Sequence, residues 1–222
     1  MKELLQKISY CIEFGKVDKN SPYPPDMKGE DGAYELTRSA LGSGIPAEKV
    51  LNDAMLDGMR KVGEKFRAGK IYVPNVLIAA KAMSAAMGLL KPYFLSGEVK
   101  HKGTIVIGTV AGDLHDIGKN LVKMVFEGGG WNVIDLGVDV SGQKFLESIS
   151  EHPEVKAVGL SALLTTTMLN MKSITEKIKL EAPDVKVLVG GAPLSEDFAY
   201  KINADFYSAN PQDALEYLNS AS

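Results

Sequence analysis

The sequence predicts an α/β protein in two parts, a helical bundle followed by a parallel, doubly wound sheet. In roughly the first hundred residues, apolar side chains recur every three or four positions, which is the spacing of amphipathic helices. Farther along, apolar runs of four to six residues alternate with helical stretches, as in the βαβ units of parallel sheets. The polar, glycine-bounded stretch 96–103 separates the two patterns. We therefore expect one domain at residues 1–97 and another at residues 103–222.

The composition is that of an ordinary globular protein and excludes several classes of function. A net charge of −3 offers no electrostatic attraction to nucleic acid or to an anionic membrane. No apolar run reaches the roughly 18 residues that a membrane span needs, and the N-terminus carries charges too early for a signal peptide. A single cysteine excludes an internal disulfide and a cysteine-clustered metal site. We expect a cytoplasmic protein with neither nucleic acid nor membrane as partner.

The first part of the chain contains four expected helices joined by short connections, which together predict a four-helix bundle. The expected helices cover residues 1–19, 33–41, 46–66 and 74–94. Three prolines exclude a helix from residues 20–26, whereas Pro46 suits the first turn of the third helix. The pairs Met55/Met59 and Met83/Met87 have helical spacing and are more often plain core than a cofactor-facing surface.

The second part contains five expected strands, each followed by a helix. The strands cover residues 104–109, 132–136, 157–161, 186–189 and 205–207, and the helices cover 117–127, 142–150, 168–181, 195–202 and 211–218. The simplest order is the flavodoxin-like 2-1-3-4-5, which makes strands 1, 3 and 4 neighbours, so that the loops at their carboxyl ends converge. No Gly-x-Gly-x-x-Gly pattern follows the first strand, which disfavours a dinucleotide site.

The loop after the first strand crowds chemistry-bearing residues into a few positions: Asp113, His115, Asp116 and Gly118. An imidazole presented from such a loop is a metal ligand or a proton-transfer base. Asp113 is close enough in sequence to hold one ring nitrogen and leave the other free. The other two histidines, His101 and His152, lie in other segments, so a metal would have to arrive inside an organic cofactor that supplies its remaining ligands.

Two further loops converge on the same edge of the expected sheet. After the third strand comes a run with four hydroxyls, at Ser161, Thr165, Thr166 and Thr167. One hydroxyl is enough to cap a helix, so four indicate a crevice that binds polar ligand edges. After the fourth strand come Gly190, Gly191 and Ala192. Adjacent glycines either make a tight turn or let a ligand lie directly on the backbone. Together these loops predict a slot walled by small residues with an imidazole at its mouth.

These residues also carry a family resemblance. Asp-x-His-x-x-Gly at Asp113, His115 and Gly118, Ser-x-Leu at Ser161 and Leu163, and Gly-Gly at residues 190–191 resemble the cobalamin-binding domain of cobalamin-dependent methyltransferases. Upstream, Gly58-Met59-x-x-Val62-Gly63-x-x-Phe66 and Val73-Pro74 resemble the helical cap of methionine synthase and of the corrinoid proteins of methanol, methylamine and methoxyarene metabolism. The resemblance covers roughly residues 45–210.

The resemblance implies that His115 replaces the cofactor's own base as lower ligand to cobalt, the arrangement called base-off/His-on. Asp113 would hydrogen-bond the ring, and Thr167, where methionine synthase has a serine, would complete the relay. The displaced nucleotide tail would pass Gly118 into the slot. The other implied cofactor contacts are Leu114, Asp116, Ile117, Ser161, Leu163, Thr165, Thr166, Gly190, Gly191, Ala192, Tyr207 and Ala209, with Met59, Phe66 and Val73 of the cap over the upper face. Asp116 either caps a helix or touches the corrin rim.

The function so implied is that of a corrinoid methyl carrier, inert on its own. It would accept a methyl group from a substrate:corrinoid methyltransferase and pass it to tetrahydrofolate or coenzyme M through a second methyltransferase, with a reductive activator to restore the cobalt. The chemistry would belong to the cobalamin, and the protein would supply ligation, orientation and shielding. The stretch 96–103 would absorb the motion that uncovers the cofactor.

Two other functions share the same motif. A cobalamin-dependent sensor or regulator has the cap and the slot but typically carries a DNA-binding module, for which this acidic chain has no basic recognition helix. The small subunit of an adenosylcobalamin mutase binds its cofactor through the same histidine motif. Whether the bound cofactor takes a methyl or an adenosyl group, and whether light releases it, distinguishes the three.

Overall fold

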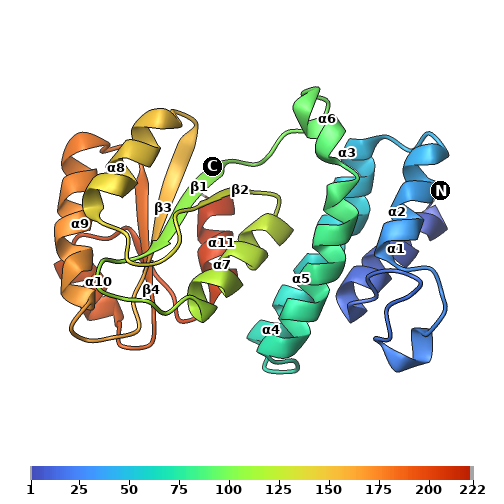
Figure 1. Cartoon of the computed structure of the whole chain (residues 1–222), viewed down its shortest axis with the longest axis horizontal. Helices are drawn as coiled ribbons and strands as arrows, with labels where there is room; N and C mark the ends of the chain where they lie inside the picture. Colours follow the sequence, from blue (N-terminus) through green and yellow to red (C-terminus); the bar gives the residue numbers. More distant parts are fainter. Residues whose placement is uncertain (1, 221–222) are drawn as a thin grey trace. The chain divides into compact units, whose positions relative to one another are not determined.

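A computed structural model describes residues 2–220. The chain divides into a helical unit that ends at His101 and an α/β unit that begins at Lys102, with Gly128–Gly130 grouped with the first (Figure 1). None of the helices in the described range has the length and apolar character needed to cross a membrane.

The helical unit contains the expected bundle. Its elements are α1 (Lys2–Phe14), η1 (Pro25–Met27), α2 (Ala33–Gly42), α3 (Ala47–Val50), η2 (Leu51–Met55), α4 (Leu56–Arg67), α5 (Val73–Gly88) and α6 (Lys91–Leu95). Helix α1 packs against α2, α4 and α5. Met55, Met59 and Met83 are buried in this core.

Three expected helices have different boundaries. The first ends at Phe14 rather than at 19, because Gly15 adopts a left-handed φ of 75° that terminates a helix. The third contains a π-helical segment, Leu51–Met55, and Pro46 precedes it as N-cap instead of standing in its first turn. The fourth breaks after Gly88, because Pro92 inside one continuous helix would clash with the carbonyl four residues earlier; α6 instead restarts with Pro92 in its first turn.

The stretch 96–103 is less free than its polar composition suggests. The Val99 N–H donates to the Tyr93 carbonyl at 3.1 Å, and Val99 itself is buried. The rings of Phe94 and His101 stack with their centroids 4.2 Å apart. Hydrogen bonding and ring stacking therefore tie part of this segment to the end of the helical unit.

The α/β unit has the predicted alternation and strand order. Its elements are β1 (Thr104–Thr109), α7 (Ile117–Gly128), β2 (Asn132–Asp135), α8 (Gly142–Glu151), β3 (Val155–Ser161), α9 (Met168–Glu181), β4 (Lys186–Gly190), α10 (Glu196–Lys201), β5 (Phe206–Tyr207) and α11 (Pro211–Ser220). The sheet order is β2-β1-β3-β4-β5 with every pair parallel, which confirms the flavodoxin-like prediction.

Helices cover both faces of this sheet, with α8, α9 and α10 on one side and α7 and α11 on the other (Figure 1). Side chains alternate between the two faces along each strand. Val106 of β1 belongs to the buried core under α8, α9 and α10, together with Val158, Met171 and Ile174. Ile105 and Ile107 face the other side. The carboxyl ends of β1, β3 and β4 meet at one edge of the sheet, which brings their loops together.

Candidate functional site

Asp113 is the centre of a hydrogen-bond network that joins the loops after β1 and β3. Its side chain is fully buried. One carboxylate oxygen, Oδ1, lies 2.7 Å from Nδ1 of His115 and also accepts the His115 backbone N–H. The other, Oδ2, accepts the Thr167 hydroxyl at 2.7 Å and the N–H groups of Leu163 and Leu164 at 2.8 and 3.2 Å. A chain of hydrogen bonds therefore runs from buried Thr167 through Asp113 to the half-exposed ring of His115.

The electrostatics of this network determine which nitrogen of the imidazole faces Asp113 with a proton. Burial by itself would raise the pKa of the Asp113 carboxyl, but the hydrogen bonds from Leu163, Thr167 and His115 outweigh burial and hold that pKa well below its usual range. An ionised carboxylate can only accept, so Nδ1 of His115 carries a proton, and in the neutral imidazole the lone pair is then on Nε2. Among the described residues, no protein group is bonded to Nε2. The ring is thus oriented as a ligand with one free nitrogen.

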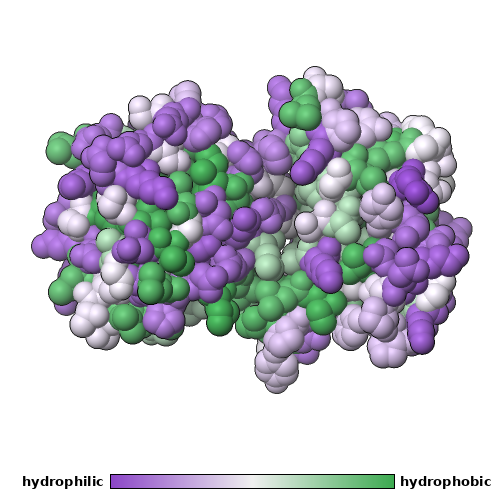
Figure 2. Space-filling model, in the orientation of Figure 1, coloured by the Kyte–Doolittle hydropathy of each residue, from purple (hydrophilic) through white to green (hydrophobic). Residues whose placement is uncertain are grey.

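Large apolar side chains of the two loops that Asp113 joins are exposed to solvent. Leu114 and Ile117 are 72% and 77% exposed, and Leu163 and Leu164 are also exposed. Figure 2 shows such hydrophobic surface on the visible face of the α/β unit. Apolar residues gathered around one polar group mark a surface that another molecule covers.

Asp116 lies in the same loop, directly before α7. Its Oδ2 accepts Nδ2 of Asn120 at 3.0 Å, and its carbonyl accepts the Asn120 N–H at 2.7 Å. These contacts put Asp116 at the beginning of α7, with its carboxylate bonded to the side chain of Asn120.

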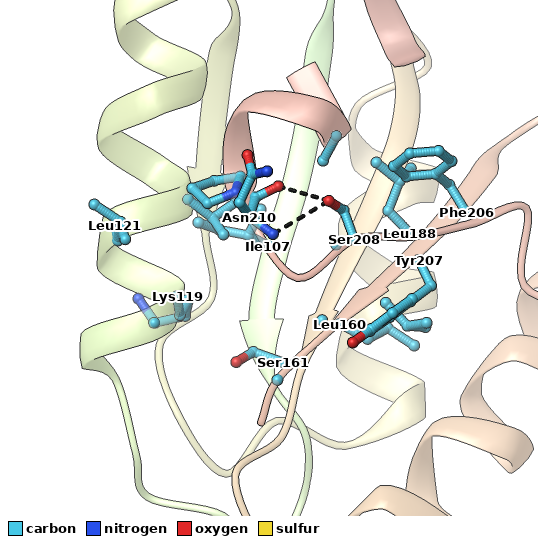
Figure 3. A pocket seen from close by; sticks show the side chains of 18 of the residues that line it. Ile107, Lys119, Leu121, Leu160, Ser161, Leu188, Phe206, Tyr207, Ser208 and Asn210 are labelled. Carbon is cyan, nitrogen blue, oxygen red and sulfur yellow. Dashed lines mark hydrogen bonds between the residues drawn. The ribbon is translucent and has the colours of Figure 1, made fainter. Parts of the chain in front are cut away.

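Beside the loop, a cavity of about 380 Å³ lies between the sheet and helices α7 and α11 (Figure 3). Lys119 and Leu121 approach it from α7, Phe206 and Tyr207 from β5, and Ser161 from the end of β3. Seven residues expected to form the slot line this cavity: Gly118, Ser161, Gly190, Gly191, Ala192, Tyr207 and Ala209. The structure thus brings together segments that are separated by as much as ninety residues of sequence.

The sequence predicts that the run of hydroxyls after β3 lines one crevice, but the structure separates these hydroxyls. Ser161 lines the cavity, whereas the Thr167 hydroxyl turns back to Asp113. Thr165 and Thr166 are exposed and lie outside the cavity lining. The N–H groups of Leu163 and Leu164 point at Asp113, and the Thr167 N–H closes a turn onto the Leu164 carbonyl. Thr165 and Thr166 lie between the ends of that turn, where they are exposed.

Two glycines at the cavity show different constraints. A Cβ at Gly191 would lie 1.8 Å from the Ala162 carbonyl oxygen, and its φ is 140°, so the fold itself requires glycine there. A Cβ at Gly118 would meet no heavy atom within 4 Å, and the residue has no left-handed φ. Protein packing does not require Gly118, which lines the cavity without a side chain. The cavity, the glycine beside it and the free nitrogen of His115 together fit a large cofactor with an extended tail.

Sequence reasoning missed the apolar lining of the cavity, including Ile105, Ile107 and Phe206. These residues have the pattern of ordinary strand core, so no local signal separates them from it. Lys119 also lines the cavity, but its Nζ donates to both carboxylate oxygens of Asp135 at 2.7 Å and to Oδ1 of Asn120 at 2.8 Å. These three acceptors occupy the three protons of its ammonium group, so Lys119 stabilises the side of the cavity through protein contacts.

The remaining site candidates belong to the helical unit. Met59 is buried in α4, whereas Phe66 and Val73 are half-buried, near the end of α4 and at the start of α5. Over residues 2–220, no group of three or more His, Cys, Asp or Glu side chains gathers in a way that could hold a metal ion. What the chain offers to a metal at this site is the single nitrogen of His115.

Comparison with known proteins identifies the cofactor. A model described as a B12 binding domain matches residues 103–216, and a second B12 binding domain model matches residues 29–91. The chain is 39% identical over 197 residues to the trimethylamine corrinoid protein 2 of Methanosarcina mazei, covering 86% of this chain and 89% of that protein. It belongs to the corrinoid proteins of methyltransferase systems. Cobalamin is therefore its cofactor.

Other corrinoid proteins extend this relationship. The dimethylamine corrinoid protein 3 of Methanosarcina acetivorans is 39% identical over 77% of this chain and 81% of its own length. A crystal structure of a cobalamin-binding protein from Desulfitobacterium hafniense has a TM-score of 0.73, with 28% identity over 97% of both chains. The methanol:cobalamin methyltransferase complex of Methanosarcina barkeri has a TM-score of 0.82, with 28% identity over 99% of this chain and 79% of that one.

Proposed function

We propose that this corrinoid protein carries a methyl group on base-off/His-on cobalamin between two methyltransferases. The observation that carries the proposal is the pairing of Asp113 with Nδ1 of His115, which leaves Nε2 free beside a cavity. The bound cobalt supplies the methyl-transfer chemistry, and the protein supplies ligation and orientation.

The residues of the loop network have separate tasks. His115 offers Nε2 as the lower axial ligand. Asp113 accepts a hydrogen bond from Nδ1–H of this ring. It keeps the ring in one orientation and raises the basicity of Nε2, as carboxylates behind metal-bound histidines do. Thr167 donates to the second oxygen of Asp113 and holds the carboxylate in place.

The cavity receives the nucleotide tail that His115 displaces. Gly118 keeps its entrance open, and Ser161, Tyr207 and the backbone of residues 190–192 provide small or polar contacts along it. Leu114, Ile117 and Leu163 offer an apolar surface to the corrin. Asp116, Thr165 and Thr166 are exposed polar groups of the same two loops.

The two units divide the work. We assign cofactor binding to the domain at 103–222 and shielding of the upper face to the cap at 1–97, through Met59, Phe66 and Val73. The stretch 96–103 absorbs the motion that exposes the cofactor to its partners, beyond the part that Val99 and His101 tie to the helical unit.

The partners follow from the relatives. Several are named trimethylamine or dimethylamine corrinoid proteins, which supports a methylamine:corrinoid methyltransferase as the enzyme that loads the methyl group. A second methyltransferase, which passes the group to tetrahydrofolate or coenzyme M, and a reductive activator complete the system.

The ligation is tested on the protein loaded with cobalamin. The absorbance and the electron paramagnetic resonance of its Co(II) form should show a base-off cofactor with splitting from one histidine nitrogen. His115→Ala should lose that splitting, whereas His152→Ala, a control in the segment between α8 and β3, should keep it. A base-on spectrum in the wild type contradicts the proposal.

The carrier role is tested with the reduced holoprotein and purified methyltransferases. Methylation of the cofactor should follow addition of a methylamine and its methyltransferase, as measured by absorbance. Formation of a stable adenosyl form, with no methylation by any such enzyme, would support a mutase subunit instead.

A further inference from the structure

Asp139 lies in the loop between β2 and α8 in a backbone conformation that L-residues rarely adopt. Its φ is 55°, and Asn203 is the other non-glycine residue with positive φ among those described. This left-handed region is unfavourable for a residue with a side chain, although Asp and Asn tolerate it better than most residues. A conformation of this kind persists only where surrounding contacts hold it.

The contacts of Asp139 reach across to the loop that carries His115. Its Oδ1 accepts the Gly112 N–H at 2.7 Å, and its own N–H donates to the Asp113 carbonyl at 3.0 Å. The two bonds meet the two-residue segment Gly112–Asp113 at its opposite ends, one at the Gly112 N–H and one at the Asp113 carbonyl. Next to Asp139, the Val140 N–H donates to the Thr109 carbonyl at 2.9 Å. Asp139 therefore holds the Gly112–Asp113 segment by one hydrogen bond at each end.

Other elements hold the same loop from different directions. Nδ2 of Asn170, on α9, donates to the Ala111 carbonyl at 2.7 Å. The Thr109 hydroxyl donates to the His115 carbonyl at 2.8 Å. With the bonds from Leu163, Leu164 and Thr167 to Asp113, the loop is fixed on several sides while the ring of His115 stays half exposed.

A purely local role for Asp139 does not account for these contacts. The start of α8 is already capped by Ser141, whose hydroxyl accepts the Lys144 N–H at 3.3 Å. The residue to which the Asp139 carboxylate bonds lies 27 positions away in sequence. Its side chain thus serves the histidine-bearing loop rather than its own turn.

We propose that Asp139 is a positioning residue for the cobalt-ligating histidine, acting by fixing the two-residue segment Gly112–Asp113 and through it the Asp113–His115 pair. This inference rests on the His-on ligation proposed above. A loop that is already ordered loses less conformational freedom when His115 binds cobalt, so the clamp strengthens the bond without touching the cofactor.

The test is a double-mutant cycle on cobalamin affinity. Asp139→Gly removes the acceptor and relieves the left-handed strain, so it changes the contact without forcing a new backbone. We expect it to weaken cobalamin binding about tenfold, the effect of losing one hydrogen bond to a charged acceptor. In a His115→Ala background the same change should have no effect, because the ligand that Asp139 positions is gone. Histidine splitting in the Co(II) spectrum should weaken in Asp139→Gly alone.

Two further variants serve as controls. Asp139→Asn keeps an oxygen acceptor for Gly112 and should stay within about twofold of the wild type. Asn203→Gly changes the other left-handed residue and should leave affinity and spectrum unchanged. If Asp139→Gly has no effect, or an equal effect with and without His115, the positioning role is wrong. If His115→Ala itself changes neither affinity nor spectrum, the ligation proposal fails first.

Discussion

The two faces of the sheet are built from the same strands but packed in opposite ways. Under α8, α9 and α10, side chains such as Val106, Val158 and Met171 are fully buried in one continuous core. Under α7 and α11, Ile105 and Ile107 line a cavity of about 380 Å³. Protein interiors are normally close-packed, with few voids larger than a water molecule. A cavity of this size on one face is the usual setting of a ligand site.

The difference teaches which face carries stability and which carries function. Strand alternation supplies apolar side chains to both faces, so the strands alone do not produce the asymmetry. The asymmetry comes from the segments around the sheet, where Gly118 of α7 has no side chain and residues 190–192 after β4 are small. One face is completed by protein, and in our proposal the other is completed by the nucleotide tail of cobalamin.

The largest expected effect is on the packed face. Met171→Ala should lower the free energy of unfolding by about 3 kcal/mol, because it deletes a fully buried side chain from a core that collapses only in part. Denaturant unfolding of the cofactor-free protein measures it. Cobalamin affinity, scored per folded molecule, should not change. A loss below about 1 kcal/mol would mean that this face is not close-packed.

Gly118→Leu, on the face with the cavity, should lower cobalamin affinity and leave stability intact, the opposite of Met171→Ala. It should weaken cobalamin binding about a hundredfold by overfilling the entrance, yet leave the cofactor-free protein as stable or up to about 1 kcal/mol more stable, since glycine disfavours helices. Equilibrium binding and thermal unfolding test the two halves. Gly88→Leu is the matched control, because a Cβ there also meets nothing within 4 Å. Equal loss of affinity in both variants would contradict a role of Gly118 in the entrance.

Thr167→Ala should cost about 1.5 kcal/mol of stability at pH 7, because it removes one donor from a buried carboxylate. The pKa of Asp113 is depressed in the folded chain, so its contribution to stability is present above the unfolded pKa of about 4 and is lost as the pH falls below it. Variant and wild type share the unfolded pKa, so the difference between them should shrink only at lower pH, as the pH falls through the depressed folded-state pKa of Asp113. Unfolding measured across pH checks this, and Thr167→Ser should retain most of the stability. A difference that is constant with pH would place the effect in packing rather than in the hydrogen bond.

The smallest expected effect compares one methyl group on each face. Ile174→Val should cost about 1 kcal/mol, and Ile107→Val less than about 0.5 kcal/mol, because the side chain of Ile107 already borders empty space. Saturating cobalamin should narrow the gap, since the bound tail supplies the contacts that Ile107 lacks. Denaturant unfolding with and without cofactor measures both. Equal costs without cofactor would remove the asymmetry between the faces.

Much of this protein follows from sequence signals that act over a few residues. The alternation of apolar runs with amphipathic stretches determines the strands and helices after residue 103, and the rules for parallel sheets then determine their order. The spacing of Asp113 and His115 is short enough for a carboxylate to reach Nδ1 within one loop. Pro92 carries the local information that ends α5, although a helical pattern extends past it.

Only the tertiary structure decided which residues meet across the sheet. The bond from Gly112 to Asp139, the outward turn of Thr165 and Thr166, and the hollow lined by Ile105, Ile107 and Phe206 depend on strand register and helix placement. An isoleucine facing a cavity has the same local sequence pattern as one facing a core. Periodicity reports which side chains are apolar and not what fills the space opposite them. The sequence therefore determined the loop that carries His115, and the fold determined the cavity and the hydrogen bonds from Asp139 to that loop.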